Sequence, residues 1–153
     1  MSTLEFRLRE GWTLRKVATT LVREWLPPFR AAPGARAARW VVQSVVEAPG
    51  GVAEQLWEPG ISTREYEERL ERPDLCWAIR ASSGRGRGTI LARLALKKEQ
   101  PETLQMLPCQ TALPEALFDQ EKLEELLQVE GPPAVADLFA ALLTHNGFQP
   151  ASS

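Results

Sequence analysis

Residues 75–98, LCWAIRASSGRGRGTILARLALKK, decide which fold the chain forms. In the first seven residues Leu75, Trp77 and Ile79 alternate with smaller or polar residues, and this period of two predicts a strand. The glycine-rich centre, residues 82–88, does not suit regular structure. Residues 89–98 suit two interpretations, because they are rich in helix-forming Leu, Ala and Lys and also alternate as a strand does. A helix there gives a strand–loop–helix unit, and a strand gives a hairpin.

The remaining apolar periodicities predict an α+β fold. Alternation or β-branched content predicts strands at 3–9, 39–47 and 103–107, although the apolar spacing at 39–47 also fits a helix. Pro49-Gly50-Gly51 predicts a turn, with 52–57 as a returning strand. Apolar stripes predict helices at 13–26, 114–129 and 134–145, and the capping box from Ser62 to Glu65 begins another at 63–71. We expect one domain over residues 1–150, a four- to five-stranded mixed or antiparallel sheet with about four helices, and a disordered tail at 151–153.

Composition narrows the class of protein. A chain of 153 residues with 44% hydrophobic and 25% charged residues is an ordinary globular domain. Its two cysteines, Cys76 and Cys109, have no metal-binding spacing and are expected to be reduced, buried thiols. The charged N-terminus does not resemble a signal peptide, and no apolar run approaches the roughly 20 residues that span a bilayer. The sequence therefore predicts a soluble cytoplasmic protein without a membrane partner.

Charge is segregated along the chain. The first hundred residues hold seventeen of the eighteen basic groups and twelve of the twenty acidic ones, a net charge of +5. The following 53 residues hold one basic and eight acidic groups, a net charge of −7. Opposite charges within one domain either hold it together or face two different partners. The predicted acidic partner face lies on the helix at 114–129 and consists of Asp119, Glu121, Glu124 and Glu125.

The glycine-arginine loop is the strongest candidate site. Glycines let successive backbone N–H groups point at one anion, and arginines add paired donors. The alternatives are a solvated hairpin tip, a phosphate or nucleic-acid contact, and a contact with an acidic protein. The predicted anion- or partner-binding residues are Gly84, Arg85, Gly86, Arg87 and Gly88 in the loop, with Arg80, Arg93, Lys97 and Lys98 on its flanks.

One family resemblance starts from the same loop. The run from Arg85 to Gly88, followed by Leu91 and Leu94, resembles the acetyl-CoA pyrophosphate loop of GNAT acetyltransferases, and residues 138–148 resemble the helix and Gly-Phe turn near the end of that fold. This resemblance implies acyl-CoA binding and transferase activity as an alternative function. Ile90 stands where the family has Gly or Ala.

No nucleophile–base pair or metal-ligand set is evident in the sequence. His145, the only histidine, falls in the last turn of a predicted helix, where a cation interacts favourably with the helix dipole. We therefore expect no catalytic residues, no metal and no cofactor. Trp12 and Trp57 are candidate interface anchors. The leading hypothesis is a non-catalytic protein–protein interaction module, an adaptor, chaperone or complex subunit. Acyl-CoA transfer and nucleic-acid binding are the alternatives, and the sequence leaves the oligomeric state open.

Overall fold

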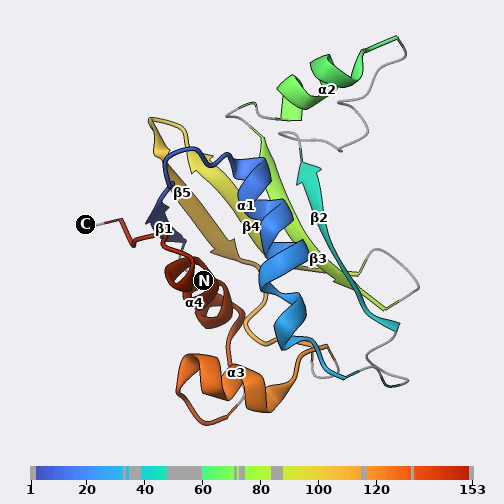
Figure 1. Ribbon diagram of the computed structural model, residues 1–153, viewed down its shortest axis with the longest axis vertical. Coiled ribbons are helices and arrows are strands. Elements are labelled where there is room, and N and C mark those ends of the chain that lie inside the picture. The colour runs from blue at the N-terminus through green and yellow to red at the C-terminus, as the bar shows by residue number, and fades with distance from the viewer. Residues whose placement is uncertain are drawn as a thin grey trace.

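The computed structural model describes residues 3–32, 34, 39–47, 60–70, 72, 75–83, 88–114, 117–131 and 133–151. Its frame is a five-stranded antiparallel sheet in the order β1-β5-β4-β3-β2 (Figure 1). The strands are β1 (Leu4–Arg7), β2 (Val41–Glu47), β3 (Cys76–Ser82), β4 (Thr89–Lys97) and β5 (Gln100–Pro108). The predicted α+β class is confirmed. The predicted turn at 49–51 and the returning strand at 52–57 lie outside the described residues.

The two ambiguous segments, 39–47 and 89–98, are both strands. β3 and β4 form the hairpin alternative, in which Trp77 pairs with Leu94 and Ile79 with Ala92. Cross-strand partners share a face, so this register places the apolar side chains of both strands together and buries them. A helix over residues 89–97 would have withdrawn Leu94 from Trp77. Tertiary pairing therefore overrides the helix propensity of Leu, Ala and Lys in β4.

The helices begin and end close to the predicted positions, with one exception. They are α1 (Leu14–Thr20), α2 (Thr63–Leu70), α3 (Gln120–Leu127) and α4 (Val135–His145). After α1 the chain continues as a π-helical segment, η1 (Leu21–Trp25), and then as a 3-10 turn, η2 (Pro27–Phe29). The exception is α3, predicted to begin at 114. It begins at Gln120, because the Asp119 carboxylate caps its first turn, and it ends where Gln128 adopts a left-handed φ of 55°.

Helices α1 and α4 cover one face of the sheet (Figure 1). The core between them and the strands includes Val17 and Leu21 from the first helix, Phe139 and Leu143 from the last, and Leu94 from β4, none of which is more than 1% exposed. Burying a side chain of this size stabilises the fold by about 1.5–3 kcal/mol. The sheet thus has one dry face, which α1 and α4 cover.

The last helix ends as its sequence predicts. Gly147 takes a left-handed φ of 88°, and the Phe148 N–H donates to the Leu143 carbonyl at 3.0 Å, which is the Schellman pattern. Phe148 is buried beside Trp12 and Trp25. The chain then turns along β1, where the Ala151 N–H donates to the Glu5 carbonyl at 3.0 Å. Residues 152–153 lie outside the described part.

Candidate functional site

The face of the sheet opposite α1 and α4, here called the open face, gathers most of the predicted basic residues that the structure describes. Arg80 projects from β3, and Arg93 and Lys97 project from β4, because each alternates with a core residue of its strand. Lys98 lies in the exposed turn before β5, and Gly88 directly precedes β4. Gly84, Arg85, Gly86 and Arg87 lie outside the described residues.

The open face is polar with apolar patches. Strand alternation places Val45, Ala78 and Leu107 there beside Glu5 and Glu47 on neighbouring strands. Val41 and Leu107 are 47% and 38% exposed, and they lie on β2 and β5, which are not neighbours in the sheet. Neither the two acidic residues nor these exposed apolar ones belong to the predicted site. The period-two pattern identifies them only after the strands are aligned.

Two ion pairs cross the open face. Arg93 Nε lies 2.8 Å from Glu47 Oε2, and Lys97 Nζ lies 3.1 Å from Glu5 Oε1. The hydrogen bond from Arg93 lowers the pKa of Glu47 below its ordinary value of 4.5, against a smaller opposing effect of burial. The same hydrogen bond raises the pKa of Arg93. Arg93 and Lys97 are therefore largely neutralised within the chain.

Arg80 has no such partner. Among the described residues its guanidinium makes neither a hydrogen bond nor an ion pair, and its Nε is buried without an acceptor. Its register neighbours are Gln43 on β2 and Ile90 on β4, neither of which carries charge. A buried donor without an acceptor costs about 1–3 kcal/mol, so the buried Arg80 Nε lowers the stability of the folded chain.

Both cysteines lie beside the ion pair between Arg93 and Glu47. The Cys76 thiol lies 3.5 Å from Glu47 Oε2, and Cys109 Sγ lies 3.4 Å from Arg93 Nη1. Both are free thiols, as expected from the sequence, but each is half-buried rather than buried, because Cys76 faces the open side of the sheet and Cys109 lies just after β5. Burial, followed by the neighbouring Glu47 carboxylate, raises the pKa of Cys76 to about 11. Cys76 is consequently a protonated thiol at neutral pH and is unsuited to act as a nucleophile.

The predicted acidic face divides into structural and free carboxylates. Asp119 caps α3 by accepting from the N–H groups of Glu121 and Lys122. Glu124 accepts from Gln120 and from the Gly131 N–H, which closes the turn after the helix. Glu121 and Glu125 remain exposed. The structure therefore leaves two of the four predicted acidic residues available to a partner.

The acidic C-terminal part does not neutralise the basic part through ion pairs between described residues. The four such pairs are Arg15–Glu67, Arg64–Glu68, Arg93–Glu47 and Lys97–Glu5, and both members of each lie in the first hundred residues. Helix α3 instead packs against α4 in the helical layer (Figure 1). In the part of the chain that the structure describes, the acidic helix α3 and the basic residues of the open face therefore lie on separate surfaces.

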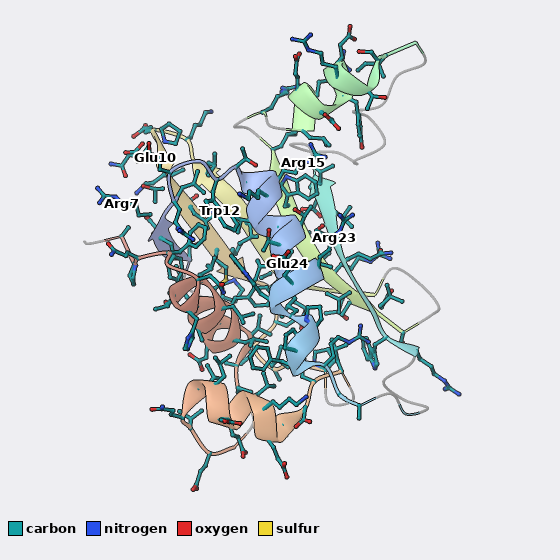
Figure 2. All side chains as sticks on the ribbon, viewed as in Figure 1. Arg7, Glu10, Trp12, Arg15, Arg23 and Glu24 are labelled. Atoms are coloured by element: carbon teal, nitrogen blue, oxygen red, sulfur yellow. The ribbon has the colours of Figure 1, made fainter. Side chains whose placement is uncertain are left out.

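Trp12 belongs to an aromatic cluster. Its ring centroid lies 5.6 Å from that of Trp25 and 5.2 Å from that of Phe148, and Lys16 Nζ sits 4.3 Å above it. Figure 2 shows Trp12 beside the start of α1, whereas Arg15, Arg23 and Glu24 project from the α1–η1 segment in the helical layer. Trp12 is half-buried, so part of it stays accessible to a partner. The other predicted anchor, Trp57, lies outside the described residues.

A cavity of about 240 Å³ lies where β1, β5 and the C-terminal segment meet, and it was not predicted. Its lining includes Arg7, Glu102, Thr103 and Gln149. Most of these side chains are exposed, and Thr103 is the one buried polar side chain among them. The cavity holds no nucleophile–base pair among its lining residues.

The described residues do not assemble a metal site. They contain no group of three or more His, Cys, Asp or Glu side chains that could hold a metal ion. His145 is exposed at the end of α4. Within the same residues, none of the helices has the length and apolar character needed to cross a membrane.

Comparison with family models, curated proteins and solved structures gives no match to this chain.

Proposed function

We propose that this chain is a non-catalytic protein–protein interaction module, an adaptor, chaperone or subunit of a larger assembly, whose partner docks on the open face. The open face itself carries the proposal. Helices α1 and α4 lie on the other face of the sheet, and the open face presents Val41, Leu107 and Arg80, whose guanidinium has no partner among the described residues. A partner that docks on this face would bury Val41 and Leu107 and bring its own charges close to Arg80.

The partner that fits this face is an acidic protein segment. A carboxylate can accept two parallel hydrogen bonds from one guanidinium, which suits Arg80. The predicted loop arginines, Arg85 and Arg87, lie outside the described residues, and in the sequence they add two positive charges between β3 and β4. Glu121 and Glu125 on α3 form a second, separate candidate surface for a basic partner.

The open face favours protein over nucleic acid as its partner. Sheets that bind single strands use aromatic side chains as stacking platforms. Within the described strands, the open face carries no Phe, Tyr or Trp, and it includes the carboxylates Glu5 and Glu47. For the acyl-CoA alternative, a helix N-terminus after the glycine-arginine loop would have helped to bind the phosphates. A strand, β4, begins at Thr89 instead, so this support for the alternative is absent there.

Charge reversal of one arginine tests the proposal. Tagged wild-type protein, Arg80→Glu and the control Arg23→Glu are used to capture proteins from extracts of the producing cells. Arg23 is exposed in the helical layer, so its reversal makes the same charge change away from the open face (Figure 2). We expect a partner that wild type and Arg23→Glu retain and Arg80→Glu loses, at unchanged melting temperature. Identical retention by all three would refute docking on this face.

A further inference from the structure

The turn that ends α4 contains a chemically labile pair, Asn146-Gly147, and Asn146 is the only asparagine of the chain. In such a pair the glycine nitrogen loses its proton to base and attacks the carbonyl carbon of the asparagine side chain. Glycine permits this attack because it has no side chain to hinder the approach. A new C–N bond forms and ammonia leaves, so that a cyclic succinimide remains, which water opens to aspartate or isoaspartate. Asn146 is therefore a candidate site of deamidation.

The fold restrains both reacting groups. The Gly147 N–H donates to the Thr144 carbonyl at 3.1 Å, so the attacking nitrogen is held in a hydrogen bond. The Asn146 Nδ2 donates to the Leu142 carbonyl at 2.7 Å, which fixes the amide against the last turn of α4. Both bonds must open together before the nitrogen reaches the side-chain carbon. Deamidation therefore proceeds through a local opening of the turn and not from its closed form.

Arg9, from the loop before α1, adds a third restraint. Its Nη1 donates to the Asn146 carbonyl at 2.8 Å, and this carbonyl belongs to the same peptide group as the Gly147 nitrogen. The guanidinium also lies 5.7 Å from the ring centroid of Trp12 and 5.9 Å from that of Phe148. Arg9 thus rests on two aromatic rings while it holds the peptide group that must move. The N-terminal loop keeps the C-terminal turn closed.

We propose that Asn146 is a site of spontaneous deamidation, that Arg9 keeps this site closed, and that its conversion loosens the C-terminal segment from β1. An aspartate at this position cannot donate to Leu142, because a carboxylate only accepts hydrogen bonds. It also places a negative charge at the C-terminus of α4, which the helix dipole disfavours. An isoaspartate inserts one more carbon into the main chain directly before Gly147.

The C-terminal segment depends on the geometry of this turn. Phe148 follows the turn directly and is buried. The next residues pair with β1, since the Gln149 carbonyl accepts from the Arg7 N–H at 2.8 Å and the Ala151 N–H donates to the Glu5 carbonyl at 3.0 Å. A turn that is lengthened or newly charged displaces Phe148 and, with it, the alignment of these two hydrogen bonds.

Deamidation rates of three proteins test the restraint. Full-length wild type, Arg9→Ala and the control Arg23→Ala are incubated at pH 8 in buffer and in urea, and peptide mass spectrometry follows the conversion of Asn146. Arg9 and Arg23 are both exposed, but Arg23 lies on η1. We expect wild type to react at least roughly tenfold more slowly in buffer than in urea, and Arg9→Ala to react roughly threefold faster than wild type in buffer alone. Arg23→Ala should match wild type.

Each rate in buffer is measured at the same interval below that protein's melting temperature and divided by its rate in urea at the same temperature, so that global unfolding does not produce the difference. Hydrogen exchange then compares unmodified wild type with the deamidated form, separated by ion-exchange chromatography. The Ala151 amide should exchange roughly threefold faster, or more, after conversion. Equal rates in buffer and urea, an unchanged rate in Arg9→Ala, or unchanged exchange at Ala151 would each overturn the inference. None of these outcomes bears on partner capture through Arg80.

Discussion

Arg93 reaches across β3 to Glu47, with its Nε 2.8 Å from the Glu47 carboxylate. The two residues belong to β4 and β2, which are not neighbours in the sheet, so this ion pair ties together three strands of the open face. The same carboxylate accepts from the Cys76 thiol at 3.5 Å on the intervening strand. The Glu47 carboxylate therefore affects the pKa values of both Arg93 and Cys76 on the open face.

Glu47→Gln should remove an acid-sensitive part of the stability. The pKa of Glu47 is lowered in the folded protein, so its contribution is complete above the unfolded value near 4.5 and is lost as pH falls through the folded value. Because both side chains are partly exposed, we expect a loss of about 1 kcal/mol or less at pH 7. Urea unfolding of both proteins at pH 7 and pH 3 measures it. A difference that does not shrink at pH 3 would contradict the assignment.

Cys76 should resist alkylation in the folded protein. With a pKa of about 11, roughly one thiol in a thousand is ionised at pH 8, and the thiolate is the reactive form. Glu47→Gln removes the neighbouring negative charge that helps to raise this pKa, so alkylation of Cys76 should become faster. Iodoacetamide labelling followed by peptide mass spectrometry gives the rate. Rapid labelling of Cys76 in wild type at pH 8 would contradict the raised pKa of this thiol.

Gly88→Ala should be more destabilising than Gly60→Ala. Both glycines have a left-handed φ, 72° and 88°, and a side chain there costs about 1–2 kcal/mol. At Gly88 a Cβ would also lie 2.6 Å from the Ser82 Cβ and would collide with the Ala81 carbonyl, whereas nothing lies within 4 Å at Gly60. We expect at least about 2 kcal/mol at Gly88 and about 1 at Gly60 from thermal unfolding. Equal losses would mean that the β3–β4 hairpin closes differently.

Asp119→Ala should lower stability by about 1 kcal/mol, because its carboxylate accepts from two N–H groups that begin α3. Glu125→Ala, on an exposed part of the same helix, is the control and should change stability by less than about 0.5 kcal/mol. Chemical denaturation of the two variants distinguishes a capping carboxylate from a surface one. The reverse order would return Asp119 to the set of residues free for a partner.

Sequence periodicity predicted the elements well where each segment carried one period. The helix capped by Thr13, the Ser62 cap of α2 and the Gly147 turn all appear as predicted, because a cap depends on residues a few positions apart. Residues 89–97 fit two periods, and their state depended on β3 and β5 lying on either side. The basic flank was identified from composition, but its neutralisation by Glu47 and Glu5 was not predictable. Those partners lie 46 and 92 positions away.

The sequence by itself determined the fold class, most of the helices and strands, and the division of the chain into a basic and an acidic part, because propensity, periodicity and charge are local properties. Only the tertiary structure decided which charges stay free. Strand order placed Glu47 within reach of Arg93 and left Arg80 between two uncharged neighbours. It also placed the C-terminal segment on β1, at one edge of the sheet. These outcomes depend on contacts between distant segments, which a linear pattern does not contain.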